Sequence, residues 1–405
     1  MSGLRLADAQ PWTLEGHWLR MDAATAALDG PFAALSLDAL AANAGDMVAR
    51  AAGTSLRLAT KSVRSRPVIE AMLATPGWHG VLAATLPEGL WLAETIDDVL
   101  VGYPTADRGA LRALVADPRS LERVTVMVDS AEHLDLIDAA APGHAEIRVA
   151  IELDAALELG PLRAGVRRSP LRSPAQVREL ARAVVDRPGF RLVGLMAYEA
   201  QVAGVQNTVA RGGVPAFVLR RMQRLSIDEL RDRRAATVAA LHELAPLEFV
   251  NGGGTGSIES TAADASVTEI GAGSGLFGAH LFDGYRGFQP APALAFALPV
   301  VRRPGSGCVT LLGGGWNASG LAGADKAPVI AWPEGLRIDP TEGAGEVQTP
   351  VLGPIADRLR LGDRVWMRHA KSGELCERTD ELHVVTGTQV LGAIPTYRGE
   401  GRKLL

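Results

Sequence analysis

The chain has 405 residues, which is long for one domain and makes two domains the natural expectation. Its 41 basic and 46 acidic residues nearly balance, so the charge gives no reason to expect a nucleic-acid partner. No apolar stretch reaches the roughly 18 residues that span a bilayer, and the N-terminus lacks the pattern of a signal peptide. Cys308 and Cys376 are the only cysteines, which excludes a disulfide scaffold and favours a cytoplasmic location.

Residues 31–290 alternate between apolar runs typical of strands and amphipathic segments typical of helices. Eight runs are candidate strands: Leu56–Thr60, Gly80–Ala84, Asp98–Tyr103, Val124–Asp129, Ile147–Leu153, Arg191–Ala197, Leu247–Val250 and Ser266–Ile270. The helical segments between them include Leu37–Ala52, Ala110–Ala116, Ala131–Ala140, Ser173–Val185 and Ile227–Leu244. Apolar strands separated by helices indicate a parallel sheet buried on both faces. Eight such units favour a closed (β/α)₈ TIM barrel, with an open doubly wound sheet as the alternative.

After about Pro290 the helical periodicity fades, and glycine, proline and short valine-rich runs predominate. Four of these runs predict strands: Phe296–Arg302, Val309–Leu312, Asp363–Met367 and Leu382–Val385. We therefore predict an α/β protein in which residues 31–290 form the barrel and residues 291–405 form an all-β domain. Residues 1–30 could supply a strand to that domain.

Lys61 directly follows the first predicted strand. Functional groups of β/α barrels lie at the C-terminal ends of the strands, and a lysine there can form a Schiff base with pyridoxal phosphate (PLP). Two tyrosines hold the corresponding strand-end positions: Tyr103 is the last residue of the third predicted strand, and Tyr198 directly follows the sixth. The alternative is that Lys61 is an ordinary surface lysine.

Two glycine-rich turns, Asn251–Ser257 and Gly271–Ser274, follow the seventh and eighth predicted strands. Glycines let backbone N–H groups approach a phosphate closely, and the loops after strands seven and eight are the usual phosphate site of such barrels. A single turn of this kind is also compatible with a merely flexible loop. Together with Lys61, the two turns predict a PLP site.

This arrangement resembles the alanine-racemase-like, fold type III PLP enzymes, and within them the D-threonine aldolase and D-serine dehydratase branch. Three stretches carry the resemblance: Leu58–Arg64, Gly194–Glu199 and Gly362–His369. The resemblance implies that Lys61 binds the cofactor covalently, that Tyr198 contacts cofactor or substrate in a catalytic role, and that Arg163 lies near the pyridine ring. It also implies a set of phosphate ligands, namely Gly253, Gly254, Thr255, Gly273 and Ser274. Because Arg163 neighbours three further arginines, a solvated basic face is the alternative for it.

The resemblance also implies a divalent metal, zinc or manganese, in the β domain. The branch holds it with a histidine and, two residues on, a cysteine or aspartate. His369 matches the histidine, but Lys371 stands at the second position. Cys376 would restore the pair if five residues were inserted between the ligands, so we predict His369 and Cys376 as the metal ligands. A small buried cysteine, however, needs no functional explanation.

By resemblance, the expected function is that of a PLP-dependent lyase acting on β-hydroxy D-amino acids. Retro-aldol cleavage to glycine and an aldehyde is the first prediction, and D-serine dehydratase-like deamination to a keto acid and ammonia is the alternative. A racemase ranks third, because it needs a second base, typically a tyrosine. A non-catalytic PLP-binding protein usually lacks the β domain. We expect a small amino-acid substrate, no nucleic-acid or membrane partner, and a homodimer.

Overall fold

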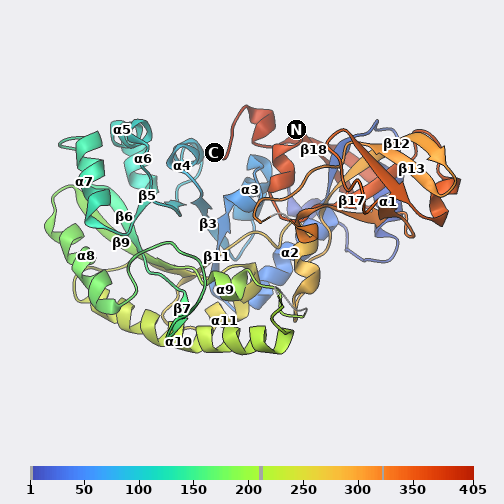
Figure 1. Ribbon diagram of the computed structural model, residues 1–405. Coiled ribbons are helices and arrows are strands. Elements are labelled where there is room, and N and C mark those ends of the chain that lie inside the picture. Colours follow the sequence, from blue (N-terminus) through green and yellow to red (C-terminus); the bar gives the residue numbers. More distant parts are fainter. Residues whose placement is uncertain (1–2, 209–212, 322) are drawn as a thin grey trace.

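The computed structural model describes residues 3–208, 213–321 and 323–405. Two parts lie side by side, an α/β barrel and a β domain built mainly from the C-terminal third of the chain (Figure 1). No helix in these three ranges is both long and apolar enough to cross a membrane.

All eight predicted strands of the first part are present, and they pair in parallel as a closed barrel. They are β2 (Ser55–Ala59), β3 (Trp78–Ala83), β4 (Val99–Val101), β5 (Val124–Val128), β6 (Ile147–Glu152), β9 (Phe190–Ala197), β10 (Phe249–Gly252) and β11 (Glu269–Ala272). The barrel closes where β11 pairs with β2, with Glu269 opposite Ser55 and Ala272 opposite Leu58. The predicted TIM barrel is therefore confirmed, and the open-sheet alternative is wrong.

Helices surround the barrel. They are α2 (Leu37–Arg50), α3 (Arg66–Leu73), α4 (Leu86–Leu92), α5 (Arg108–Ala116), α6 (Pro118–Arg123), α7 (Ala131–Ala140), α8 (Pro174–Asp186), α9 (Ala200–Ala203), α10 (Ala216–His242) and α11 (Ile258–Ala262). Helix α8 begins with a capping box, in which Ser173 and Gln176 satisfy each other's backbone N–H groups. Helix α10 begins at Ala216, well before Ile227, where the sequence predicted its start. The prediction missed the first turns because two of their buried positions are the polar residues Gln223 and Ser226, which hide the apolar periodicity.

The β domain is a nine-stranded sheet. Its strands are β1 (Phe32–Ser36), β12 (Leu294–Gly305), β13 (Cys308–Leu312), β14 (Val329–Trp332), β15 (Arg337–Ile338), β16 (Gln348–Leu352), β17 (Arg364–Arg368), β18 (Glu381–Thr386) and β19 (Gln389–Pro395). Strand β1 lies inside this sheet, antiparallel to β12 and parallel to β18. Strand β1 therefore lies within the range predicted for the barrel and not in residues 1–30, whose described part, residues 3–30, contains no strand, and the barrel segment begins with α2.

The remaining elements are short. They are α1 (His17–Ala24), the hairpin β7 (Leu157–Leu159) and β8 (Leu162–Ala164), and the 3₁₀ turns η1 (Leu6–Asp8), η2 (Thr60–Ser62), η3 (Thr255–Ser257), η4 (His280–Gly284), η5 (Ala324–Lys326), η6 (Pro354–Arg358), η7 (Glu374–Glu377) and η8 (Arg398–Glu400). Among these, η2, η3, η4 and η7 border a cavity at the carboxyl ends of the barrel strands.

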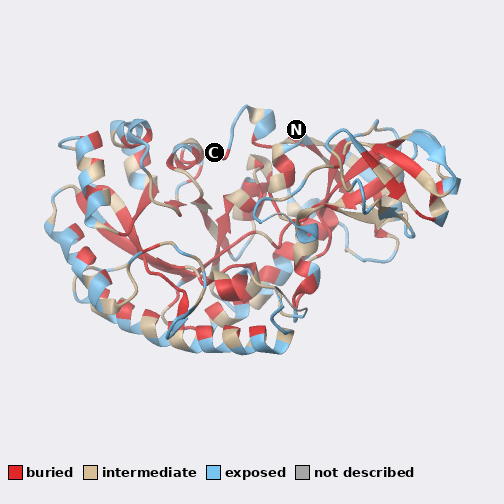
Figure 2. Cartoon of the chain, viewed as in Figure 1, coloured by how far each residue is buried: buried red, intermediate tan, exposed pale blue. Residues whose placement is uncertain are grey.

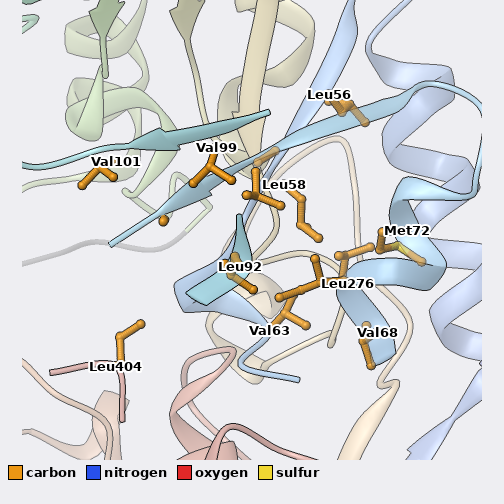
Figure 3. Packing of buried hydrophobic residues seen from close by; sticks show 14 of the residues in the cluster. Leu56, Leu58, Val63, Val68, Met72, Leu92, Val99, Val101, Leu276 and Leu404 are labelled. Atoms are coloured by element: carbon orange, nitrogen blue, oxygen red, sulfur yellow. The ribbon is translucent and has the colours of Figure 1, made fainter. Parts of the chain in front are cut away.

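One hydrophobic core runs through both parts. Leu56 and Leu58 of β2 pack with Leu276 and with Val68 and Met72 of α3 (Figure 3). The same cluster continues into the β domain through residues of β1, β12 and β18, namely Leu35, Leu294 and Val384. Buried residues accordingly follow the strands of both parts, while the outer face of α10 is exposed (Figure 2). Because the core is shared, packing fixes the β domain against the barrel.

A buried charge cluster lies near the end of the barrel where the strands begin. Arg57 of β2 is 1 % exposed, and its guanidinium donates to Glu269 at 2.6 Å and to Asp98 at 2.8 Å. Asn251 also donates to Glu269, at 2.9 Å. Although burial raises the pKa of Glu269, the Arg57 charge and these hydrogen bonds outweigh it and lower the pKa to about 2.

Candidate active site

A cavity of about 450 Å³ lies at the carboxyl ends of the barrel strands, within the range of small-molecule sites. Both glycine turns and both predicted catalytic residues line it. The predicted residues on its wall are Lys61, Tyr198, Gly253, Gly254, Thr255, Gly273 and Ser274. Three predicted residues, Arg163, His369 and Cys376, are not among its lining residues.

Lys61 reaches the cavity because β2 ends at Ala59 and the chain turns at once into η2. The Lys61 Nζ atom donates a hydrogen bond of 2.7 Å to the hydroxyl of Tyr103, which follows β4. Burial alone would raise the pKa of Tyr103, but the charges of Lys61 and Arg168 and the bond from Lys61 lower it below its ordinary value. The two side chains therefore form a pair able to hold a proton at the centre of the site.

Arg168 lies close to Tyr103 and Tyr198, two of the three tyrosines that line the cavity. Its guanidinium carbon is 5.2 Å from the centre of the Tyr103 ring and 4.9 Å from that of Tyr198. Burial raises the pKa of Tyr198 to about 12, so this hydroxyl stays protonated and can donate a hydrogen bond. Arg168 also lies 3.6 Å from the carboxylate of Glu152 at the end of β6.

The first glycine turn is held from behind by a buried carboxylate. Glu199 accepts hydrogen bonds from the Gly253 backbone at 3.1 Å, from Ser257 at 3.1 Å and from Thr261 at 2.6 Å. Arg234 compensates its charge at 3.2 Å. With its own polar groups satisfied on that side, the turn presents its other face to the cavity.

The two turns also contact each other, and their glycines are required by close packing. The Thr255 hydroxyl accepts hydrogen bonds from the Ser274 hydroxyl at 3.1 Å and from the Gly275 backbone at 3.0 Å. A β-carbon at Gly254 would lie 2.9 Å from Ala203, and one at Gly273 would lie 2.9 Å from the Ala59 carbonyl. One wall offers hydroxyls and glycine backbone, which fit the phosphate of PLP. The Lys61 amine, opposite this wall, fits the aldehyde of PLP.

The β domain supplies the remaining wall through the loop between β17 and η7. Ser372 donates a hydrogen bond to the Ser274 carbonyl, and a β-carbon at Gly373 would lie 2.2 Å from the Lys61 carbonyl. Residues 371, 372 and 374 line the cavity together with Lys61. The site is therefore built jointly by the barrel and the β domain.

Arg163 lies away from the cavity. It belongs to the hairpin strand β8, and its guanidinium bonds to Asp154 and Glu158. Arg168, five residues further on, lines the cavity in its place, and Arg64 lines it as well. Sequence reasoning missed Arg168 because the loop between β6 and α8 has no periodicity from which side-chain direction follows. Its place in an arginine-rich stretch after strand β6 is the one available signal.

The predicted metal ligands do not form a site. Cys376 is fully buried in the hydrophobic core, where burial raises the pKa of its thiol to about 12. His369 is 3 % exposed, burial lowers its pKa to about 3, and its ring nitrogens have no hydrogen-bond partner in the part of the chain described. No three His, Cys, Asp or Glu side chains gather as a metal-binding group among those residues. Lys371, two residues after His369, lines the cavity instead.

Glu152 predicts a pH dependence of stability. Burial raises its pKa to about 7, with Arg168 opposing and Asp129 reinforcing the shift. The folded protein therefore holds a proton on Glu152 that the unfolded chain lacks between the ordinary value, 4.5, and about 7, so the contribution of Glu152 to stability falls as the pH rises through that window. Between about pH 5 and pH 7.5 we expect the Glu152 contribution to the unfolding free energy of the cofactor-free protein, taken as the difference between wild type and Glu152→Gln, to fall on the order of 2 kcal/mol.

Glu152→Gln should remove this part of the pH dependence, which urea unfolding at the two pH values would measure. Glu243→Gln is the matched control, because Glu243 is an exposed carboxylate paired with Arg178 on the surface. Equal pH dependence in the wild-type protein and Glu152→Gln would contradict the assignment.

A closed barrel with a lysine after its first strand, glycine turns after its last two and a β domain over its mouth defines an alanine-racemase-like protein. Residues 35–280, more than half of the chain, match the family described as "Alanine racemase, N-terminal domain". The chain belongs to this family, as the sequence predicted.

Two curated relatives are similar over part of the chain. D-threonine aldolase of Arthrobacter sp is 29% identical over 220 residues, which are 53% of this chain and 52% of the relative. The 3-hydroxy-D-aspartate aldolase of Paracoccus denitrificans is 28% identical over 257 residues, 61% of this chain and 60% of the relative. The matched stretch thus spans between half and two thirds of the length of these relatives.

Solved structures share the fold over nearly the whole chain. D-threonine aldolase from Filomicrobium marinum superposes with a TM-score of 0.75 at 22% identity, covering 92% of this chain and 95% of its own. D-threo-3-hydroxyaspartate dehydratase from Delftia sp. HT23 gives 0.72 at 20% identity, covering 91% and 97%. Variants of a D-threo-3-hydroxyaspartate dehydratase replace a histidine or, two positions on, a cysteine with alanine, and the cysteine variant is in the metal-free form.

Proposed function

We propose that this protein is a PLP-dependent lyase that cleaves β-hydroxy D-amino acids by a retro-aldol reaction to glycine and an aldehyde. The observation that carries the proposal is one cavity that brings the Lys61 amine together with both glycine turns. The similarity to a D-threonine aldolase and a 3-hydroxy-D-aspartate aldolase supports the reaction class.

In this proposal Lys61 holds PLP covalently, and Gly253, Gly254, Thr255, Gly273 and Ser274 hold its phosphate. When bound, PLP withdraws electrons from the α-carbon of an amino acid, so that a bond to that carbon can break. Arg163 has no role in the proposal. We assign the cationic position beside the pyridine ring of the cofactor to Arg168, which lies beside Tyr198 in the cavity.

In the proposed reaction, side chains of this protein transfer protons and orient the substrate. Lys61 and Tyr103, joined by their 2.7 Å hydrogen bond, exchange a proton with the substrate at the α-carbon side of the cavity. Arg168 holds both tyrosine rings in place, and the protonated Tyr198 hydroxyl donates to a substrate or cofactor oxygen. The shared core keeps the β-domain loop over the mouth and so restricts the access of water.

The alternative is a dehydratase, which would release ammonia and a keto acid from the same substrates. The fold of a D-threo-3-hydroxyaspartate dehydratase is nearly as close as that of the aldolase, so the alternative stands on the same architecture. A racemase would need a second base, typically a tyrosine. Two of the four tyrosines are already engaged in hydrogen bonds, since Tyr285 donates to the Ala203 carbonyl and Tyr397 to Glu88, and this disfavours both as that base. A non-catalytic PLP-binding protein is disfavoured by the β domain.

The metal expected from the branch does not fit the donors present. The histidine and cysteine of the dehydratase variants are two positions apart, and the same spacing from His369 leads here to Lys371. No catalytic step is therefore assigned to a metal. A homodimer located in the cytoplasm remains part of the proposal, and gel filtration with light scattering would test the dimer.

Product analysis distinguishes these functions. Protein loaded with PLP is incubated with D-threonine, 3-hydroxy-D-aspartate, D-serine or L-threonine, and glycine, aldehyde, ammonia and keto acid are measured. We expect glycine and aldehyde in equal amounts from a D-substrate and none from L-threonine. Ammonia and keto acid without glycine would establish the dehydratase, whereas an unchanged cofactor spectrum with no product would overturn lyase activity altogether.

A further inference from the structure

Lys371 places a second amine on the wall of the candidate active site. The chain has four lysines among its 41 basic residues, and two of them, Lys61 and Lys371, line the same cavity. Lys371 comes from the β domain, three residues after the end of β17, and is half-buried. Because lysine is so rare in this chain, its use at this position calls for a chemical reason.

The ammonium of Lys371 has no carboxylate partner. Its Nζ atom donates to the Ser319 carbonyl at 2.6 Å and lies 3.5 Å from the Ser319 hydroxyl. Across residues 3–208, 213–321 and 323–405 no acidic oxygen lies within 4.0 Å of it, whereas Lys326 pairs with Asp325. The nearby Glu374 accepts hydrogen bonds from the Ser319 backbone at 2.8 Å and from the Ser319 hydroxyl. A half-buried cation without a counter-ion favours a negatively charged group in the cavity beside it.

The two residues that follow Lys371 are fixed against the barrel. Ser372 bonds to the carbonyl of Ser274, and Gly373 lies so close to the Lys61 carbonyl that a β-carbon would meet it at 2.2 Å. Lys371 is thus anchored relative to both the phosphate turn and the catalytic lysine, as a preorganised charge requires.

The space between His369 and Lys371 is unfavourable for a divalent metal. The void beside His369 is about 10 Å³, roughly the space of one water, and its charged lining residues are Lys371, Arg378 and Glu374. An ion there would face two positive side chains, and an ammonium donates hydrogen bonds without offering a lone pair to a metal. Among the described residues that line this void, His369 and Glu374 are the only two of the His, Cys, Asp and Glu type, and Glu374 already accepts two hydrogen bonds from Ser319, so the void lacks the number of ligands that a metal centre needs.

We propose that Lys371 supplies, as a fixed ammonium, the positive charge that a divalent metal would place at this wall, so that the enzyme works without a bound divalent metal. The proposal rests on the proposed function. The Lys61–Tyr103 pair takes the proton of the β-hydroxyl, and the O–H electron pair becomes the second C–O bond of the aldehyde as the Cα–Cβ bond breaks. The α-carbon keeps the electron pair of the broken bond and is protonated to give glycine. The Lys371 ammonium stabilises the negative charge that develops on the oxygen as its proton leaves.

The test compares wild-type protein with Lys371→Met, Lys371→Arg and the control Lys326→Met, all loaded with PLP and treated with EDTA. Wild-type protein should retain fewer than about 0.1 zinc or manganese ions per chain after exposure to either metal and desalting. Its turnover should change less than about twofold when manganese is added, and Lys371→Met should lose about 100-fold in kcat/KM with its cofactor absorbance intact. Lys371→Arg should recover part of the loss, and Lys326→Met should match the wild type.

Stoichiometric metal in the wild-type protein, together with EDTA-sensitive turnover, would overturn the proposal, as would near-wild-type turnover of Lys371→Met. If the wild-type protein turns over no β-hydroxy D-amino acid, the proposed function fails, and Lys371 is then judged on binding alone. In that case 3-hydroxy-D-aspartate is titrated into the PLP-loaded proteins, and its binding is followed by the cofactor absorbance. It should bind about tenfold more weakly to Lys371→Met than to the wild type. Equal affinities would refute the role of the ammonium.

Discussion

Replacing Lys61 with alanine is expected to abolish both the visible absorbance of bound PLP and lyase activity. Lys61 is the lysine that contacts Tyr103 inside the cavity, and its amine is the group that can bind the cofactor covalently. We expect turnover to fall at least about a thousandfold, which corresponds to about 4 kcal/mol in activation free energy. Absorbance spectra and product release after dialysis would measure the two effects.

Lys403→Ala is the control for this variant, because Lys403 is exposed in the C-terminal segment. Circular dichroism of Lys61→Ala should match the wild type, which separates loss of chemistry from loss of fold. A visible band of normal intensity in Lys61→Ala would show that another amine holds the cofactor, and the proposed site would then be wrong.

The largest effect on stability is expected at Arg57. Arg57→Met leaves Glu269, 2 % exposed, without its cation inside the barrel. Removing one partner of a buried ion pair costs about 3–5 kcal/mol, and urea unfolding of the cofactor-free protein would show the loss as a lower midpoint. Because the folded-state pKa of Glu269 is about 2, its contribution is present above the ordinary value of 4.5 and is lost as the pH falls from there towards 2.

Two further variants make the Arg57 prediction specific. Arg191→Met removes a surface arginine, 46% exposed, that pairs with Glu146 and Glu248, and should cost less than about 1 kcal/mol. The double variant Arg57→Met/Glu269→Gln should regain part of the loss, since the uncompensated charge is gone. A single variant as stable as the wild type would contradict the assignment of Arg57 and Glu269 as a stabilising pair.

The barrel and part of its site were predictable because they depend on local patterns. Strands buried on both faces give continuous apolar runs, which located all eight barrel strands, and the strand ends then gave Lys61, Tyr198 and the glycine turns. The membership of β1 in the second sheet was not readable, because its partners β12 and β18 lie more than 250 residues away in sequence.

The side chains that were missed lie in segments without periodicity. Arg163 and Arg168 are both in the irregular stretch after β6, where only the folded hairpin decides which one turns inward. Lys371 is noticeable in the sequence only as a departure from a metal-binding pattern. Its position in the cavity depends on long-range contacts of its loop with Ser274 and Lys61.

The contact between Gly373 and Lys61 limits how the protein can be recombined. Gly373 has a backbone φ of +76°, and any larger residue there would displace the main chain of the catalytic lysine. A chimera that joins this barrel to the β domain of a relative must therefore keep a glycine at the position of Gly373, as well as the strands of the nine-stranded sheet. A substitution in either part at this contact therefore constrains which residues the other part tolerates there.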